Sequence, residues 1–109
     1  MTFSIVIPTK NRPKELVTVF DSLLAQTRLP DQIIIIDQSC PDKVTKDELT
    51  ILAEKANVTL NYIHDESITG LVQAKAASIQ YNYCDYISFF DDDIVHEPDY
   101  LAVIEQALT

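Results

Sequence analysis

The sequence YISFFDDD, at residues 86–93, places an apolar run directly before three consecutive aspartates. The run carries aromatic and β-branched residues and contains neither Gly nor Pro, which is typical of a short buried strand. Such a strand delivers Asp91, Asp92 and Asp93 to one rim of a sheet, where two carboxylates within ~4 Å repel by roughly 4 kcal/mol at an effective dielectric of about 20. A divalent cation offsets that repulsion most directly, and carboxylate oxygens suit Mg²⁺ or Mn²⁺. The alternative is a solvated acidic turn before a helix.

Strand-like and helix-like segments alternate along the whole chain. Strands are expected at residues 2–8, 32–36, 58–63 and 86–90. Helices are expected to begin at Pro13, near Thr45, at Thr69-Gly70 and at Pro98, the first of them ending near Gln26. Four isoleucines fill residues 33–36, and a continuous apolar run indicates a strand covered on both faces. The order βαβαβαβα predicts an α/β fold in which helices cover both faces of a parallel sheet.

Apolar residues at helical spacing predict the buried face of each helix. In the first helix they are Leu16, Phe20, Leu23 and Leu24, and in the third helix they are Val72, Ala76, Ile79 and Tyr83. A capping-box pair, Thr45 and Glu48, is expected to open the second helix. Tyr81, Tyr83 and Tyr86 are interpreted as core or edge packing.

The composition indicates one small acidic domain. The chain has 109 residues, with 8 basic residues, 17 acidic residues and a formal net charge of −9. That charge argues against nucleic acid as a partner, although a nucleotide bound through a metal stays compatible with it. No apolar stretch is long enough to span a bilayer, no signal peptide is expected, and Cys40 and Cys84 suggest no disulfide framework. A cytoplasmic location is expected, with a peripheral position at the inner face of a membrane as an alternative.

The polar residues gather where the predicted strands end. Pro8, Thr9, Asn11 and Arg12 follow the first strand, Asp37 the second, Asp65, Glu66 and Lys75 the third, and the aspartates the fourth. In parallel sheets, ligands bind beyond the carboxyl ends of the strands, so a polar site is expected at that rim. Gly70 is the only glycine, so the sequence contains none of the usual glycine-rich phosphate loops.

Four motifs, in order and with suitable spacing, resemble the N-terminal half of a family 2 glycosyltransferase with the GT-A fold. They are SIVIPTKNR at residues 4–12, IIIIDQSCPD at 33–42, GLVQAK at 70–75, which is similar to Gly-x-x-x-Ala-Arg, and FFDDD at 89–93, which is similar to the D-x-D motif. The resemblance covers nearly the whole chain. It implies a Rossmann-like nucleotide-binding half, one domain over residues 1–109, that is truncated at the C-terminus.

The resemblance implies roles for residues at the rim. Pro8 and Thr9 would lie against the base and ribose of a nucleotide, and Asp37 would accept a hydrogen bond from N3–H of uracil or thymine. Lys75 takes the place of an arginine near the base and diphosphate. As a point charge, it cannot reproduce the bidentate fork of arginine. Further departures from the family pattern are Gln38, Ile68 and Ala76.

The resemblance assigns the metal to the aspartates. Asp93 would bind Mn²⁺ or Mg²⁺ that bridges the diphosphate, and Asp91 would face the ribose or the metal and its water shell. Asn11, Arg12 and Asp92 complete the predicted nucleotide-binding set; Asn11 and Arg12 could equally serve the start of the helix. Asp92 is expected to point away from its neighbours, because side chains alternate on extended backbone. Of the isolated histidines, His64 is interpreted as structural and His96 as structural or close to the metal.

The leading hypothesis is metal-dependent transfer of a sugar from a UDP- or dTDP-sugar to a saccharide or lipid-linked acceptor in polysaccharide biosynthesis, with inversion. Inversion needs a general base, and the sequence offers no candidate for it, so the fragment alone is expected to be inactive. The alternatives are a non-catalytic nucleotide-binding or scaffold fragment and a phospho-acceptor signalling domain. The signalling domain ranks low because the first strand ends in Pro8-Thr9 instead of carboxylates. The oligomeric state is left open, and self-association through a truncated apolar edge is expected as a hazard.

Overall fold

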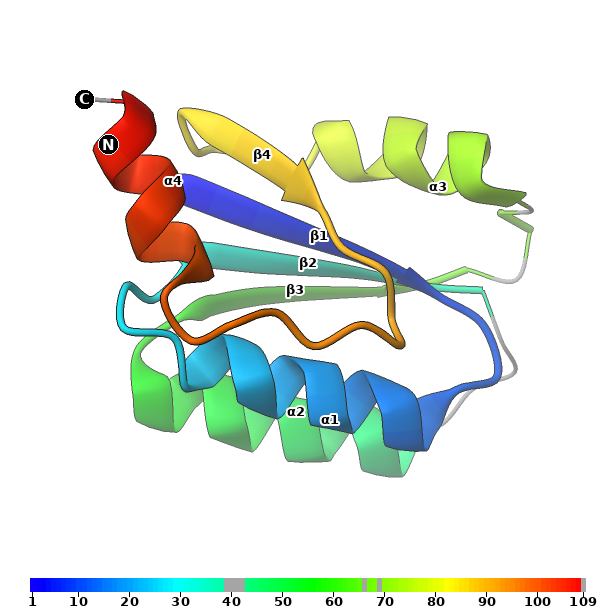
Figure 1. Cartoon of the computed structure of the whole chain (residues 1–109). Coiled ribbons are helices and arrows are strands. Elements are labelled where there is room, and N and C mark those ends of the chain that lie inside the picture. The colour runs from blue at the N-terminus through cyan, green and yellow to red at the C-terminus, as the bar shows by residue number, and fades with distance from the viewer. Residues whose placement is uncertain (39–42, 66, 69, 109) are drawn as a thin grey trace.

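A computed structural model describes residues 1–38, 43–65, 67–68 and 70–108 (Figure 1). Its elements are β1 (Phe3–Thr9), α1 (Pro13–Leu24), β2 (Gln32–Asp37), α2 (Lys43–Ala56), β3 (Thr59–His64), α3 (Gly70–Ile79), β4 (Tyr86–Phe89) and α4 (Tyr100–Leu108). The strands form one parallel sheet in the order β3-β2-β1-β4. The predicted α/β alternation is confirmed. Cys40, Glu66, Thr69 and Thr109 lie outside the described residues.

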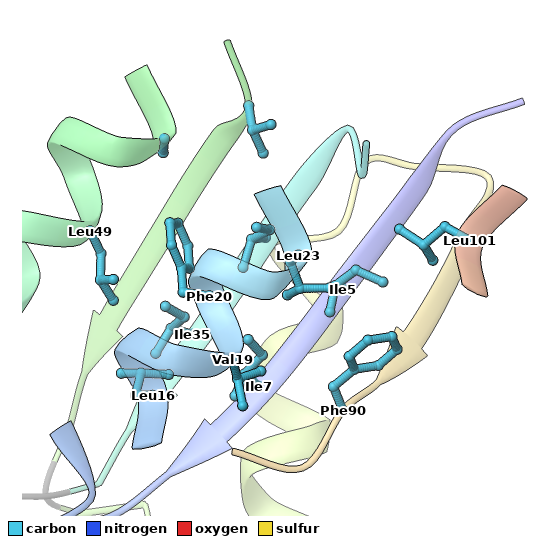
Figure 2. Packing of buried hydrophobic residues seen from close by; sticks show 13 residues of the cluster. Ile5, Ile7, Leu16, Val19, Phe20, Leu23, Ile35, Leu49, Phe90 and Leu101 are labelled. Carbon is cyan, nitrogen blue, oxygen red and sulfur yellow. The ribbon is translucent and has the colours of Figure 1, made fainter. Parts of the chain in front are cut away.

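Helices cover both faces of the sheet, as the sequence predicts. On one face, α1 and α2 pack against the sheet, and Figure 2 shows Phe20 and Leu23 of α1 directed toward Ile5 and Ile35. Leu101 of α4 joins the same buried cluster. On the other face, α3 packs on β1 and β2. The central strands are therefore covered on both sides, which explains the continuous isoleucine run in β2.

Three predicted helix boundaries need correction. The helix α2 begins at Lys43, so Thr45 lies inside its first turn and cannot be the N-cap of a capping box. The helix α4 begins at Tyr100, because Pro98 and Asp99 form a turn before it, and α1 ends at Leu24 instead of near Gln26. Pro13 does occupy the start of α1, where its missing N–H costs no hydrogen bond.

The predicted buried face of α3 is wrong. Val72 is 81% exposed and Ile79 is 60% exposed, whereas Ala74 and Ser78 are fully buried against the sheet. Apolar and small residues occur on several sides of this helix, so spacing alone does not select the side that packs. Small side chains allow the helix to lie close to the strands, and larger ones are left outside.

Tyr83 lies beyond the end of α3 and is 60% exposed, and Tyr86 of the edge strand β4 is 40% exposed. Exposed apolar side chains therefore occur on α3, in the segment after it and on the edge strand β4. Self-association through it stays a prediction; sedimentation as a clean monomer at high concentration would count against it.

A buried glutamine holds the amino end of the sheet together. Gln32 Nε2 donates to Asn61 Oδ1 at 2.8 Å and to the Tyr81 carbonyl at 2.7 Å, and Gln32 Oε1 accepts from Ser4 Oγ at 2.8 Å and from Tyr83 N at 3.2 Å. Because a buried amide is costly unless its hydrogen bonds are made, this network fixes the segment before β4 on the sheet. Within the described residues, no helix is both long and apolar enough to cross a membrane.

Candidate functional site

The carboxyl ends of three neighbouring strands meet at one rim. Thr9 ends β1, and its register partner Asp37 ends β2; both side chains are buried. On the other side of β1, the aspartates follow β4, which ends at Phe89. The sequence prediction that these polar residues share one rim of the sheet is therefore confirmed by the strand order.

Asp92 ties the end of β4 to the end of β1. Its side chain is 12% exposed; Oδ2 accepts from Thr9 Oγ1 at 2.8 Å, and Oδ1 accepts from Arg12 Nη1 at 3.2 Å. Both carboxylate oxygens are thus engaged within the protein. These bonds give Asp92 a structural part at the rim, and its predicted contact with a nucleotide stays a prediction.

The same arginine also reaches Asp93. Arg12 Nη1 lies 3.0 Å from Asp93 Oδ2, and both side chains are 50% exposed. The sequence analysis expected Asp92 to point away from its neighbours. This is wrong with respect to Asp93, because both side chains contact the same guanidinium nitrogen. The physical reason is that β4 ends at Phe89 and the two aspartates lie in a turn, where strand alternation no longer applies.

Local backbone geometry directs Arg12 to the aspartates. Asn11 has a φ of 57°, a left-handed conformation that asparagine tolerates better than most residues, and it turns the chain after β1. Arg12 is the N-cap residue of α1, but its side chain makes no capping hydrogen bond and extends to the acidic turn instead. The sequence analysis considered two roles for Arg12, one at the start of the helix and one as a ligand contact. It missed the ion pair, because the pair joins segments about 80 residues apart.

A small pocket opens on the α3 side of the rim. It is lined by Pro8, Lys75, Phe89, Phe90, Asp91 and Asp92, with a volume of about 100 Å³. Lys75 Nζ lies 5.0 Å from the centroid of the Phe89 ring, within the range of a cation–π contact. The structure therefore brings four residues of the predicted nucleotide-binding set, Pro8, Lys75, Asp91 and Asp92, to one cavity. Phe89 and Phe90 also line it, and the sequence analysis assigned neither of them.

Asp37 is held by a tyrosine that the sequence analysis missed. Tyr62 Oη donates to Asp37 Oδ2 at 2.5 Å from the neighbouring strand β3. The register places Tyr62 opposite Ile35, two residues before Asp37, so both side chains point to the same face of the sheet. Once strands 2 and 3 are paired in this register, their alternation could have suggested the contact.

The remaining polar candidates have local partners. The His96 ring lies between aromatic rings, with centroids 4.2 Å from Phe90 and 4.4 Å from Tyr100, which favours its structural interpretation. Asp65 Oδ1 accepts from Ser67 Oγ at 2.6 Å and from Ser67 N at 2.9 Å. These bonds, the side-chain one first, hold the pKa of Asp65 below its ordinary value.

The donor atoms at the rim suit a hard divalent cation that shares its coordination with a substrate. Asp91 and Asp93 are both exposed and offer carboxylate oxygens. No group of three or more His, Cys, Asp or Glu side chains in the described part of the chain could hold a metal by itself. Mg²⁺ commonly takes one or two carboxylates together with substrate phosphates, so the residues fit a metal bound in that way.

Known proteins resemble this chain in sequence and fold. An uncharacterized glycosyltransferase of Haemophilus influenzae is 26% identical over 107 residues, which are 94% of this chain and 34% of the relative. The crystal structure of S. aureus TarS 1-349 in complex with UDP superposes with a TM-score of 0.79 at 18% identity, covering 97% of this chain and 31% of TarS. A mannosyltransferase from Pyrobaculum calidifontis, PcManGT, in complex with GDP-Man and Mn²⁺, gives a TM-score of 0.79 at 15% identity, covering 92% and 30%.

The structural likenesses show the fold, a GT-A glycosyltransferase fold, and the chain spans about a third of the length of these three proteins. The family described as Glycosyl transferase family 2 matches residues 4–108, nearly the whole chain. The four sequence motifs and the parallel sheet are consistent with that match. This chain therefore belongs to glycosyl transferase family 2.

Proposed function

We propose that this chain forms the nucleotide-sugar-binding part of a metal-dependent glycosyltransferase that uses a UDP- or dTDP-sugar. The observation that carries the proposal is the rim at which Pro8, Lys75 and Asp91 line one pocket while Asp93 lies in the same acidic turn. Structurally similar proteins have been crystallised with UDP, UDP-GlcNAc and GDP-Man, which supports a nucleotide-linked sugar as the donor.

Each rim residue has a physical task in this proposal. Asp37, oriented by Tyr62, accepts a hydrogen bond from the base, and Thr9 and Pro8 contact the base and ribose. Lys75 lies in α3 beside the pocket and places its positive charge near the diphosphate. Breaking the sugar–phosphate bond adds negative charge to the leaving nucleoside diphosphate, and a nearby cationic side chain stabilises it.

The metal belongs to the same proposal. Asp93 would ligate Mn²⁺ or Mg²⁺, with Asp91 as a ligand or a partner of its water shell. The bound metal would supply Lewis-acid stabilisation of the diphosphate oxygens. Mn²⁺ is present in the PcManGT complex and in a glucosyl-3-phosphoglycerate synthase complex of the same fold, which supports a divalent cation here.

Transfer to the acceptor requires more than these residues. An inverting reaction needs a general base that takes the proton of the acceptor hydroxyl, and we assign none among the rim residues. The proposal places the base and the saccharide or lipid-linked acceptor site outside this chain, so the chain alone binds the donor without turnover.

A second candidate is a non-catalytic fragment. The rim pocket of about 100 Å³ is small beside the roughly 300–1,000 Å³ of typical ligand sites. That size favours a site that is incomplete in the isolated chain, and it predicts weak binding or none.

Calorimetric titration separates these possibilities. UDP, dTDP and GDP are titrated with and without Mn²⁺ into the wild-type chain, Asp93→Ala and the control Asp47→Ala, which removes an exposed carboxylate from α2. Metal-dependent binding of UDP or dTDP that Asp93→Ala abolishes and Asp47→Ala retains would support the donor site. A folded sample that binds none of the three would favour the non-catalytic fragment.

A further inference from the structure

One guanidinium nitrogen of Arg12 contacts two carboxylates of the acidic turn. Nη1 lies 3.2 Å from Asp92 Oδ1 and 3.0 Å from Asp93 Oδ2. A terminal guanidinium nitrogen carries two N–H groups, so it can donate to both oxygens at once. A positive charge of the protein itself therefore lies where the carboxylates meet.

The two ends of this bridge differ in how firmly they are held. Asp92 is largely buried and its other oxygen accepts from Thr9 Oγ1, so this carboxylate is fixed to β1. Asp93 is half exposed, and among the described residues its carboxylate bonds to Arg12 alone. Exposed ion pairs are weak and exchange readily with solvent and ions. Asp93 is therefore the partner that Arg12 can release.

We propose that Arg12 is a resident counter-cation of the acidic turn, and that a divalent cation must displace it from Asp93 while Arg12 keeps its bond to Asp92. This inference rests on the proposed function, because it takes Asp93 as a metal ligand. It adds that Arg12 and the metal compete for one carboxylate, which makes Arg12 a positioning residue that sets metal affinity.

The competition follows from the geometry of the shared oxygen. A metal bound by either oxygen of the Asp93 carboxylate would lie near the guanidinium that contacts Oδ2 at 3.0 Å, and the two positive charges would repel. We therefore expect the Arg12–Asp93 bond to break, and its free energy is subtracted from that of metal binding. When no metal is bound, the positive charge of Arg12 reduces the repulsion between the Asp92 and Asp93 carboxylates.

Mn²⁺ titration followed by electron paramagnetic resonance tests the competition without nucleotide. Arg12→Gln removes the charge and keeps a shorter polar side chain, and Lys10→Gln is the matched control. Lys10 is exposed in the same loop, and the described residues give it no ion pair. We expect Arg12→Gln to bind Mn²⁺ about fivefold more tightly than the wild type, roughly 1 kcal/mol in all. The variant has no Asp93 pair to break, which contributes less than about 0.5 kcal/mol, and it lacks the positive charge that repels the metal. Lys10→Gln should change affinity by less than about twofold, and Asp93→Asn should abolish the binding.

The outcomes separate this inference from the proposed function. Unchanged or weaker Mn²⁺ binding by Arg12→Gln, with binding still dependent on Asp93, would overturn the competition and leave the metal site standing. Binding that Asp93→Asn does not affect would overturn both. An equal gain in Lys10→Gln would assign the effect to net charge and also overturn the competition.

A second measurement uses the unmodified chain and does not depend on the folding of a variant. The Nε–Hε resonance of Arg12 is followed by NMR during a Mg²⁺ titration. Displacement from Asp93 predicts a saturable shift of this resonance, whereas the corresponding resonance of Arg28 stays unchanged. Saturable Mg²⁺ binding that shifts the backbone amide of Asp93 but leaves the Arg12 resonance unchanged would contradict the proposal.

Discussion

Arg12 and Arg28 each bridge two carboxylates, but at opposite ends of the sheet and in different surroundings. Arg28 is 19% exposed and contacts Asp31 and Glu105, both at 2.9 Å, and its guanidinium lies 4.7 Å from the centroid of the Phe3 ring. Arg12 is 50% exposed and uses one nitrogen for both of its partners. One arginine between two carboxylates thus forms a sheltered contact at the amino end of the sheet, the Arg28 staple. At the carboxyl end it forms an exposed contact, the open bridge of Arg12.

The difference lies in how many groups hold each guanidinium. Arg28 also donates to the carbonyls of Met1, at 2.7 Å, and Leu29, so all three of its nitrogens are used. Burial alone lowers the pKa of Arg28, but its hydrogen bonds to Glu105 and Asp31 raise it above the usual value. An arginine whose three nitrogens all donate within the protein stabilises the fold, whereas one that uses a single nitrogen can exchange a partner for a ligand.

The largest expected effect is the loss of the staple. Arg28→Ala removes hydrogen bonds to carboxylates and carbonyls and the contact with Phe3, so we expect it to lower the free energy of unfolding by roughly 2 kcal/mol. Arg12→Ala should lower it by less than about 0.5 kcal/mol. Urea denaturation of both variants measures the contrast, and equal losses would contradict it.

The next largest effect is the difference in stability loss between substitutions of the two aspartates that contact Arg12. Asp92→Ala leaves the buried Thr9 hydroxyl without its acceptor and frees the end of β4 from β1, so we expect a loss of about 1–2 kcal/mol. Asp93→Ala should cost less than about 0.5 kcal/mol, because its pair is half exposed. Thermal unfolding compares the two, and an Asp92→Ala variant as stable as Asp93→Ala would mean that Asp92 does not anchor the turn.

The Asp37 carboxylate accepts a hydrogen bond from the neutral hydroxyl of Tyr62, whereas the Asp92 carboxylate accepts one from an arginine. If Tyr62 orients Asp37 for a nucleotide base, Tyr62→Phe should weaken UDP binding about fivefold, or roughly 1 kcal/mol. The control Tyr81→Phe alters an exposed tyrosine near the opposite end of the sheet. Calorimetry of UDP binding measures both, and equal affinities in the two variants would remove Tyr62 from the site.

The fold could be predicted because its signals are local. The isoleucine run of β2, Pro13 at the start of α1 and the alternation of strands with helices each identify an element from neighbouring residues. The rim followed from strand ends that a parallel sheet must bring together. The sequence order of strands was enough for that step, since it needs no knowledge of side-chain partners.

The long-range ion-pair partners of the two arginines could not be predicted, because each such pair joins segments that are far apart in the sequence. Arg28 meets Glu105 across 77 residues, and Arg12 meets Asp92 across 80. Neither pair has a signal in local spacing. The buried side of α3 was missed for a different reason: the selection of Ala74 over Val72 depends on how closely that helix approaches the sheet.

The smallest expected effect comes from salt and distinguishes the two arginines without a ligand. At 1 M NaCl the screening length falls to about 3 Å, so a half-exposed pair loses most of its attraction, while a sheltered and hydrogen-bonded one loses less. The stability difference between wild type and Arg12→Ala should therefore shrink by a few tenths of a kcal/mol toward zero between about 0.05 and 1 M. The difference for Arg28→Ala should keep more than half of its value, because its contacts with Phe3 and the backbone carbonyls are short-range and sheltered, so salt screens them less. Urea midpoints at the two salt concentrations give both numbers. A difference for Arg28→Ala that vanishes in salt would show that the staple is held by charge alone, and that the two bridges differ in exposure but not in kind.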